Sequence, residues 1–454
     1  MTARPRLEDV YAHLESGFEE ALDELADLVR IPGISAQPTD ALDQCAEVVR
    51  QSMLRSGLRT TLIEGFGPAA VYGERIVDPA LPTVLIYGHY DVQPAEREGW
   101  NTDPFEPVVR EGRLYGRGSS DNNGQHLAHL WGIRSTLAVQ GELPVNVKVL
   151  IEGEEEIDSP HLAELVRANR ELLTADLAIT SDGPVHRSGT PQLVLGTRGQ
   201  LGVELRARGA NQDAHSGSLG GLLPDPAAEL VKALASLWQP DGRVAVAGFY
   251  EQVLESTTQE RDNLARLPLD LDAHFATYGI TELPPPSQLG FYDRLMLQPT
   301  MTITGMASGY SGPGMKTIIS ASAMARLDMR LVPNQDPDQV FNAVQAHLGR
   351  VAPQVEVVRI GSGPASRTPI DNPYIPILED AIEAATGQAP FIVPSLGSTL
   401  PNYVFTDILG MPSVLVPYAN ADQNNHAANE NFELSRYLDG MKISAALLQD
   451  LAPG

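Results

Sequence analysis

Short apolar runs that alternate with helical patterns constrain the fold of this chain of 454 residues more than any other feature. The runs are rich in Val, Ile and Leu and are flanked by turn residues, which is typical of buried parallel strands. They cover residues 83–87, 145–151, 177–180 and 413–417, and helical patterns cover residues 14–28, 126–137, 160–173 and 376–385. Alternating strands and helices predict an α/β sheet.

The middle third of the chain has a different rhythm. Its strand-like and helical segments follow the order β-α-β-β-α-β of a ferredoxin-like α+β unit, at residues 201–208, 226–238, 300–304, 321–331, 337–348 and 355–360. Because the α/β pattern resumes afterwards, we expect a discontinuous first domain of residues 1–198 and 366–454, with an inserted domain of residues 199–365. Within the insertion, residues 239–297 hold Pro284, Pro285 and Pro286 and are expected to form surface structure.

Charge and cysteine content exclude several classes of function. The chain has 32 Lys and Arg against 58 Asp and Glu, a net charge of -26, which argues against nucleic-acid and anionic-membrane partners. Cys45 is the only cysteine, so no intrachain disulfide is expected. The N-terminus lacks the continuous apolar stretch of a secretory signal. A run of about 18 apolar residues, as a membrane span needs, does not occur in the sequence. We therefore expect a cytoplasmic protein.

Metal-ligating residue types follow four of the predicted strands. His89 and Asp91 come just after residues 83–87, and the glutamates 154–156 come just after residues 145–151. Asp182 follows residues 177–180, and His426 lies in the loop after residues 413–417. Because ligands of open α/β sheets bind at the carboxyl ends of the strands, these side chains are expected to meet at one edge.

Each of these signals also has an ordinary structural interpretation. The sequence His-x-Asp at residue 89 is weak alone, three glutamates can form a solvated turn, Asp182 is a common turn residue, and His426 can be a loop histidine. Asp121, in YGRGSSDNNGQ, is either a helix cap or a carboxylate that bridges two cations. Their combination favours a site for two divalent ions, with zinc, manganese and cobalt all compatible with His and carboxylate ligands.

Six motifs carry a resemblance to a known family. The sequences are GHYDVQP, GRGSSDNNGQ, EGEEEIDS, DAHSGSLGG, RLVPN and the loop around His426. In order and spacing they resemble the zinc-dependent exopeptidase family that includes carnosine dipeptidases, glutamate carboxypeptidase, aminoacylase and succinyl-diaminopimelate desuccinylase. The dipeptidase branch is the most similar. The resemblance implies a mixed-sheet α/β metallopeptidase domain with an inserted ferredoxin-like lid and dimerisation domain.

The resemblance also implies roles for individual residues around two metal ions, of which zinc is expected. His89 and Asp182 would bind one ion, Glu156 and His426 the other, and Asp121 both. Glu155 would be the general base and Asp91 would orient His89, because a carboxylate on the second ring nitrogen fixes the tautomer of a histidine ligand. A cis peptide bond after Asp121 is also implied.

Substrate-binding residues are implied in the inserted domain and near the C-terminus. His215 would reach the active site of a partner subunit in a homodimer and bind the substrate carbonyl oxygen. Thr317, Arg330 and Ser398 would hold the terminal carboxylate of the substrate, for which a fork of guanidinium donors is suited. Asn122, Asn123 and Glu154 depart from the family pattern, which leaves the substrate preference open.

The resulting hypothesis is an exopeptidase that hydrolyses dipeptides or similar small amides with a free carboxylate, using two metals and water. An alternative with the same metal centre is a deacylase acting on acylated amino acids. A metal-binding homologue without catalysis is a third hypothesis, but the presence of Glu155 beside Glu156 disfavours it, because a binding protein has no use for the extra base.

Overall fold

The computed structural model describes residues 7–37, 39–284 and 289–452. The chain divides into two compact units. Unit 1 comprises Met1–Gly196, Arg367–Val393 and Pro401–Gly454, and unit 2 comprises Thr197–Ser366 and Pro394–Leu400. The segment Pro394–Leu400 was assigned with the first domain from the sequence, so that assignment is wrong for these residues. Pro285 and Pro286 lie outside the described residues.

Unit 1 is built on a mixed sheet of eight strands. Their order is β1 (Arg59–Ile63), β2 (Ala70–Arg75), β6 (Asn146–Glu152), β3 (Thr83–His89), β7 (Leu177–Thr180), β18 (Ser413–Leu415), β8 (Gln192–Val194) and β17 (Phe391–Val393). The central strands β6, β3, β7 and β18 run parallel, as predicted, whereas β2 pairs antiparallel with β6. The carboxyl ends of these four strands therefore lie at one edge of the sheet.

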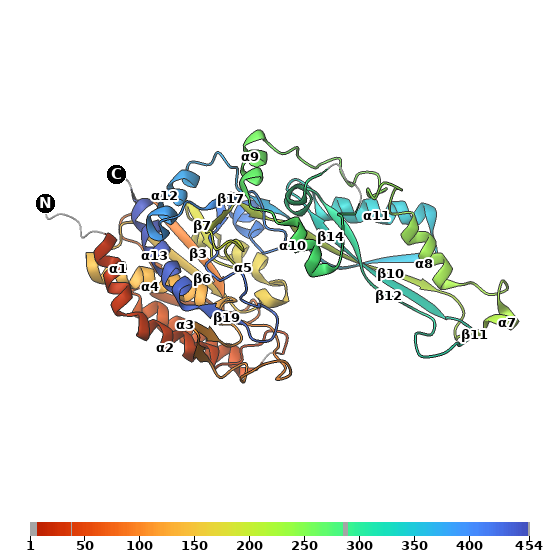
Figure 1. Ribbon diagram of the computed structural model, residues 1–454, viewed down its shortest axis with the longest axis horizontal. Helices are drawn as coiled ribbons and strands as arrows, with labels where there is room; N and C mark the ends of the chain where they lie inside the picture. The colour runs from red at the N-terminus through yellow and green to blue at the C-terminus, as the bar shows by residue number, and fades with distance from the viewer. Residues whose placement is uncertain (1–6, 38, 285–288, 453–454) are drawn as a thin grey trace. The chain divides into compact units, whose positions relative to one another are not determined.

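Helices cover both faces of this sheet, which is why its central strands are apolar along their whole length. One face packs against α1 (Leu7–Ser16), α2 (Phe18–Val29), α3 (Asp40–Arg55), α4 (Asn123–Gln140), α12 (Tyr374–Thr386) and α13 (Leu434–Asp450). The other packs against α5 (Leu162–Ala168) and the short helix η3 (Val404–Leu409). The first and last helices of the chain lie side by side, as α1 and α13 show in Figure 1.

Two predicted helices are interrupted in the structure. The single helix expected over residues 14–28 is α1 and α2, which meet at Gly17, where a Cβ atom would lie 2.9 Å from Trp131 Cζ3. The helix expected over residues 160–173 is α5 followed by α6 (Arg170–Leu173), with Asn169 between them. Within the described part of the chain, no helix is long and apolar enough to cross a bilayer.

A small sheet of three strands supports the loops at the edge of unit 1. It consists of β4 (Val108–Arg110), β5 (Arg113–Tyr115) and β19 (Asn431–Glu433), all in antiparallel pairs. This sheet brings the residues just before Asp121 next to the residues just after His426.

Unit 2 has the predicted β-α-β-β-α-β order. Its antiparallel sheet has the order β12 (Thr300–Ser308), β14 (Ser322–Leu331), β10 (Gly199–Arg208) and β15 (Val355–Gly363). Alternate residues of β14, from Ala323 to Leu331, are buried against α8 (Pro226–Ala235) and α11 (Pro337–Val351). The predicted surface segment contains α9 (Thr258–Arg266), α10 (Leu271–Tyr278) and η2 (Asp293–Leu297).

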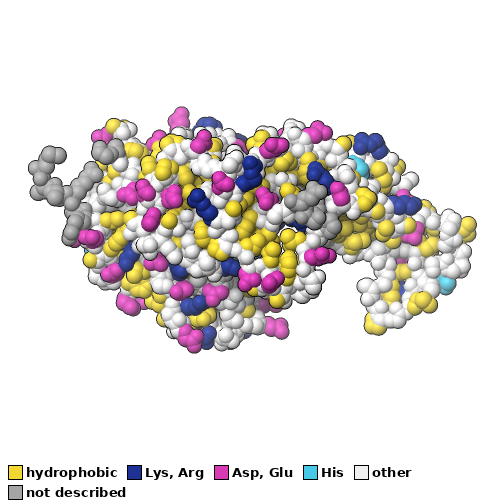
Figure 2. All heavy atoms as spheres, turned by 45° about the horizontal axis from the view of Figure 1, so that its top comes forward, with side chains coloured by type: hydrophobic (Ala, Val, Ile, Leu, Met, Phe, Trp, Pro, Cys, Tyr) yellow, Lys and Arg dark blue, Asp and Glu magenta, His cyan; other side chains and the backbone are white. Residues whose placement is uncertain are grey.

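One end of unit 2 carries a small two-stranded sheet of β11 (Ala214–His215) and β13 (Ile318–Ile319), with the one-turn helix α7 (Ser216–Leu219) beside it (Figure 1). Few charged side chains are visible on this end in Figure 2, whereas acidic and basic side chains are scattered over the rest of the face shown. Large hydrophobic side chains are exposed on its segments, namely Leu219, Leu222, Met306, Tyr310 and Met315.

Candidate metal centre

The strand ends of unit 1 bring the predicted ligands together. His89 is the last residue of β3, Asp182 follows β7, and Glu155 and Glu156 begin the short helix η1 (Glu155–Ile157) after β6. Asp121 lies just before α4, and His426 lies in the loop between β18 and β19. His89, Asp121 and Asp182 are buried, whereas the side chain of His426 is 52% exposed.

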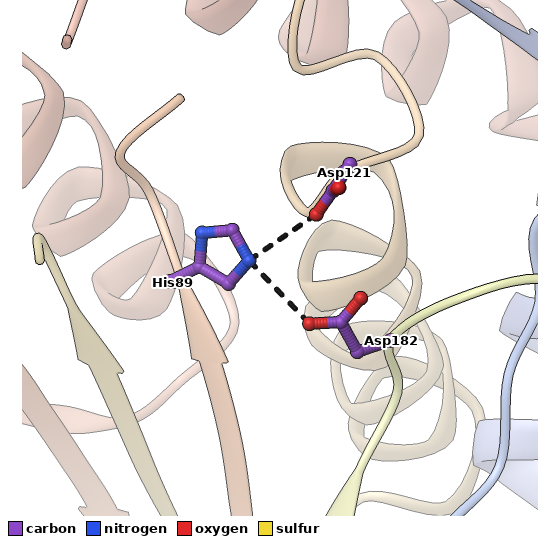
Figure 3. Close-up of side chains that lie close together, drawn as sticks. All are labelled: His89, Asp121 and Asp182. Carbon is purple, nitrogen blue, oxygen red and sulfur yellow. Dashed lines mark ion pairs between the residues drawn. The ribbon is translucent and has the colours of Figure 1, made fainter. Parts of the chain in front are cut away.

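The ligand atoms form two groups that share Asp121. In the first, His89 Nε2 lies 3.3 Å from Asp121 Oδ1 and 3.5 Å from Asp182 Oδ2. Figure 3 shows both carboxylates on the same side of the His89 ring. In the second, His426 Nε2 lies 3.1 Å from Asp121 Oδ2 and 3.0 Å from Glu156 Oε2. Each oxygen of Asp121 thus belongs to a different group, as a bridging carboxylate requires.

The residues of both groups fit divalent cations. His89 Nε2 is buried and has no hydrogen-bond partner among the residues that the structure describes. Burial by itself would lower the pKa of His89, but the carboxylates of Asp121, Asp182 and Asp91 raise that pKa well above its usual value. The site therefore favours positive charge at this nitrogen, and imidazole and carboxylate donors are ligands for zinc, manganese and cobalt.

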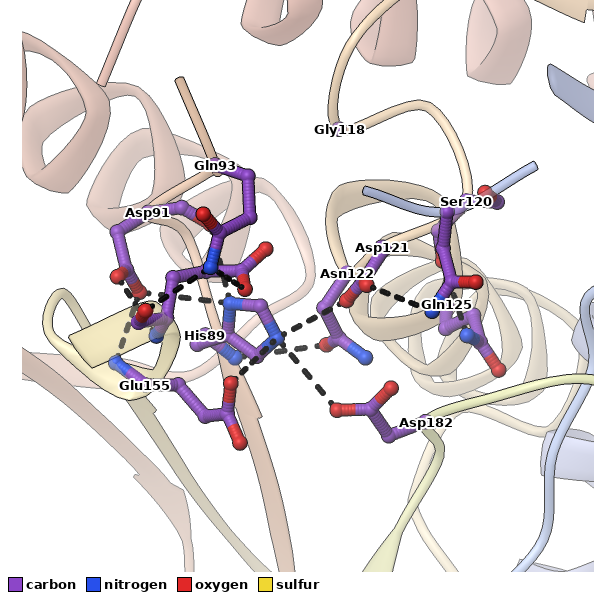
Figure 4. Close-up of polar contacts among 12 residues, drawn as sticks. His89, Asp91, Gln93, Gly118, Ser120, Asp121, Asn122, Gln125, Glu155 and Asp182 are labelled. Carbon is purple, nitrogen blue, oxygen red and sulfur yellow. Dashed lines mark hydrogen bonds and ion pairs between the residues drawn. The ribbon is translucent and has the colours of Figure 1, made fainter. Parts of the chain in front are cut away.

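Glu155 lies beside the ligand groups. Its Oε2 atom is 3.8 Å from His89 Nε2 (Figure 4). Burial and the neighbouring carboxylates of Asp182, Glu156 and Asp121 raise the pKa of Glu155 well above its usual value. A carboxyl group with a raised pKa, next to candidate metal ligands, can accept and return a proton.

Asp91 holds this segment in place through both its main chain and its side chain. Its main-chain oxygen is 3.0 Å from His89 Nδ1, whereas its Oδ1 atom is 3.4 Å from the same nitrogen. The Asp91 carboxylate accepts the main-chain N–H group of Glu155 at 3.1 Å (Figure 4). It also accepts the main-chain N–H group of Glu156 at 3.1 Å. The anchoring of Glu155 and Glu156 was not predicted from the sequence.

Comparison with known proteins places the chain in a family. Residues 85–450 match the model of peptidase family M20/M25/M40. The chain belongs to this peptidase family. Human Beta-Ala-His dipeptidase is 30% identical over 473 residues, which cover 98% of this chain and 93% of that protein.

Two further relatives are similar to this chain over nearly its whole length. The Cys-Gly metallodipeptidase dug1 of Schizosaccharomyces pombe is 28% identical, with 98% of both chains covered. The structure of the M20 family metallo-carboxypeptidase Sso-CP2 from Sulfolobus solfataricus matches with a TM-score of 0.89 and 33% identity, over 95% of this chain and 99% of that one. The predicted family, the mixed α/β fold and the metal-dependent peptidase class are therefore confirmed.

In this M20 peptidase, two of the departures from the family pattern, Asn122 and Glu154, have structural explanations. Asn122 is buried, accepts the main-chain N–H of His89 at 3.4 Å and donates to the main-chain oxygen of Ser181 at 2.6 Å. Its side chain thus links the ends of β3 and β7. The Asp121–Asn122 peptide bond is cis, as the resemblance implied. Glu154 Oε2 lies 2.7 Å from His161 Nδ1 and is separate from the two ligand groups.

The contacts of Gln93 with the candidate ligand Glu156 were not predicted from the sequence. Gln93 Nε2 donates to Glu156 Oε2 at 2.9 Å and to the main-chain oxygen of Glu156 at 3.0 Å. Gln93 lies within the motif GHYDVQP, but only the first part of that motif suggested a function. The hydrogen bond from Gln93 holds Glu156 Oε2, the same oxygen that lies near His426 Nε2.

The substrate-binding candidates of unit 2 form two pairs rather than one cluster. His215 Nε2 lies 3.4 Å from Thr317 Oγ1 at the end that carries β11 and β13. Arg330 Nη1 donates to Thr399 Oγ1 at 2.8 Å, next to Ser398. The register of β10 and β14 pairs Gln200 with Arg330 at one end of the sheet and Arg208 with Ser322 at the other.

The two pairs are far apart within one chain, so a carboxylate held by Thr317, Arg330 and Ser398 together stays a prediction. From Gln200 to Arg208, β10 advances by eight residue steps, which is about 26 Å of strand. His215 and Thr317 lie beyond the Ser322 end, because Ala321 N–H bonds Asp213 Oδ1 and Ser216 N–H bonds the Thr317 oxygen. A dipeptide spans only about 7 Å.

Arg198 is a further arginine beside Ser398 that was not predicted from the sequence. Its main-chain N–H donates to the Ser398 oxygen at 3.2 Å, and its Nε donates to the Gly397 oxygen at 2.9 Å. Burial, and to a lesser degree the charge of Arg330, lower the pKa of Arg198 to about 10. Two neighbouring guanidinium groups favour an anion between them.

Proposed function

We propose that this M20 peptidase hydrolyses dipeptides that carry a free terminal carboxylate, with two divalent metal ions, zinc in the first instance. One observation carries the proposal: two ligand groups share the two oxygens of Asp121, and Glu155 lies next to them. The names of the relatives, Beta-Ala-His dipeptidase and Cys-Gly metallodipeptidase, support a dipeptide as the substrate.

The residues divide the chemistry between them. Two divalent ions at such a site lower the pKa of water and stabilise the oxygen that becomes negative during attack. His89 and Asp182 would hold one ion, Glu156 and His426 the other, and Asp121 both. Glu155 removes the proton of the attacking water and delivers it to the leaving amine. Asp91 and Gln93 keep the base and the ligand Glu156 in position.

The terminal carboxylate of the substrate is assigned to Arg330 and Ser398, with Arg198 as an added cation. The bidentate geometry of a guanidinium group matches a planar carboxylate. The contacts of Arg198 with the 397–398 main chain and of Arg330 with Thr399 bring these groups to one end of the sheet of unit 2.

We further propose a homodimer in which His215, together with Thr317, completes the active site of the partner subunit. The roughly 26 Å of sheet between this pair and Arg330 supports the proposal, because a single dipeptide cannot contact both in one chain. The exposed hydrophobic side chains at the β11 and β13 end, including Met315 at 90% exposure, are of the kind that a partner covers. A cytoplasmic location remains a prediction.

The test combines metal analysis with a substrate panel. Purified protein should contain two equivalents of metal per chain and should cleave dipeptides, and a chelator should abolish the activity, which added zinc then restores. Cleavage of N-acyl amino acids but not of dipeptides would favour the deacylase alternative. Two bound metals without hydrolysis of either class would contradict the proposal.

A further inference from the structure

Glu430 is a buried carboxylate for which the proposed reaction has no direct use. Its side chain is 0% exposed and that of its partner Arg117 is 3% exposed. Glu430 Oε2 accepts from Arg117 Nη1 at 2.7 Å and from the main-chain N–H of Gly118 at 3.0 Å. Glu430 Oε1 accepts from the main-chain N–H groups of Ser120 and Asp121, each at 3.1 Å, and from Ser120 Oγ at 3.0 Å.

These five donors belong to one short loop, and the loop ends in the shared ligand. Gly118, Ser120 and Asp121 follow each other into the start of α4 (Figure 4). Glu430 itself belongs to the loop that carries His426, and its main-chain oxygen accepts the N–H of Gly116 at 3.0 Å. The Glu430 carboxylate therefore joins the loop of Asp121 to the loop of His426.

The chemistry of the contacts suits an acceptor with two equivalent oxygens. All five partners are donors, and an ionised carboxylate accepts on both oxygens, whereas a glutamine side chain turns an N–H group towards some of these donors. A buried carboxylate is tolerated only when its charge is paired and its lone pairs are satisfied, as they are here. Glu430 can therefore fix the spacing of the two loops more firmly than a neutral residue would.

We propose that Glu430 is a positioning residue that sets the separation of Asp121 and His426, and through it the metal affinity of the site formed by Asp121, Glu156 and His426. The inference rests on the metal centre of the proposed function but not on the identity of the substrate. Outer residues that orient metal ligands typically change metal affinity by 10-fold to 100-fold when they are replaced.

The experiment measures zinc affinity at both sites of Glu430→Gln by competition with a chromophoric chelator, alongside its melting temperature. We expect the affinity of one site to fall by about 10-fold to 100-fold. The matched control is Glu24→Gln, which removes another buried carboxylate that binds Arg134, Arg55 and Trp131 Nε1 on the helical side of unit 1. The control should lower the melting temperature but leave both zinc affinities unchanged.

A second variant keeps the test decisive if Glu430→Gln does not fold. Ser120→Ala removes only the hydroxyl donor to Glu430 and should weaken one zinc site by about threefold to tenfold, the equivalent of one hydrogen bond. If Glu430→Gln folds and both its zinc affinities are within twofold of wild type, the inference is overturned. If it does not fold, the same result for Ser120→Ala overturns the inference. Wild-type protein that binds no zinc would overturn it together with the metal centre, whereas wild type with two zinc ions and no dipeptidase activity would refute only the proposed substrate.

Discussion

Among the residues of the site, Glu154 and Glu155 are neighbours in sequence with different surroundings. Glu155 faces the ligand groups, whereas Glu154 is bound to His161. Glu155→Gln should therefore keep both metals and lose roughly 100-fold to 10,000-fold in turnover, the usual size of a general acid–base contribution. Turnover and metal content are measured together. Glu154→Gln is the control and should retain turnover close to wild type, and near-normal turnover of a metal-loaded Glu155→Gln would exclude Glu155 as the base.

Asp121 and Asp182 provide a second comparison between single residues. Asp121 has one oxygen in each ligand group, whereas Asp182 belongs to only one group. Asp121→Ala should lower the occupancy of both metals, and Asp182→Ala should mainly lower one. Metal content after dialysis against limiting zinc distinguishes them. Two full sites in Asp121→Ala would refute the bridging role.

The ligand candidates could be predicted because most of them follow apolar strands, and the ends of parallel strands meet in space whatever their distance in sequence. The contacts of Glu430 and Arg117 could not, because they join residues 313 positions apart and neither residue lies at a strand end that the sequence marked. The contacts of Asn122 could not be predicted either. From the sequence, Asn122 bore only on the substrate preference, whereas in the structure its amide bonds main-chain groups of β3 and of the residues after β7.

At the scale of the element, α4 places neutral histidine in the core. His129 is buried between Ser444, Ser181 and Tyr418, and burial lowers its pKa from 6.5 to about 3. The unfolded chain therefore binds a proton at a pH where the folded chain does not. The stability contribution of a neutral His129 is fully present above pH 6.5 and should be lost progressively as the pH falls towards 3.

The measurement is the free energy of unfolding in urea at several pH values from 7 to 4. On acidification the wild type should lose more stability than His129→Gln, which cannot take up the proton but still offers hydrogen-bonding groups. Equal slopes for the two proteins would show that His129 does not titrate on unfolding.

Helices and strands with a clear hydrophobic pattern could be predicted from the sequence, and the shortest strands could not. The strands β3, β6, β7 and β18 are apolar runs that can be recognised without neighbours. The strands β4, β5 and β19 have three residues each, too few for an alternating pattern, and exist because residues 113–115 pair with residues 431–433. The breaks at Gly17 and Asn169 depend on packing and local backbone geometry that periodicity does not report.

For the whole molecule, the critical prediction concerns assembly. His215→Ala and Glu155→Gln should each lose most of their activity as homodimers. If His215 acts in the partner subunit, a heterodimer of the two variants has one site with both defects and one site with neither. Mixing the variants should then restore activity to near half of normal per heterodimer, once subunit exchange has been verified. No recovery would mean that His215 acts within its own chain or has no role in catalysis.

The insertion of one unit into the other could be inferred because the α/β pattern stops and later resumes. The membership of Pro394–Leu400 in unit 2 could not, because these residues lie between elements of unit 1 and join unit 2 through contacts such as Arg330 with Thr399. Ser398 therefore belongs with Arg330 and not with the strands that flank it in sequence.

The late position of His426 and Glu430 also matters while the chain is being synthesised. His89, Asp121, Glu155, Glu156 and Asp182 have all been translated before the ribosome begins unit 2 at Thr197, but the donors of the 117–121 loop have no carboxylate to bind until Glu430 emerges. Chains terminated before this loop would thus lack both His426 and Glu430, so the group of Asp121, Glu156 and His426 can be complete only in chains translated through β19.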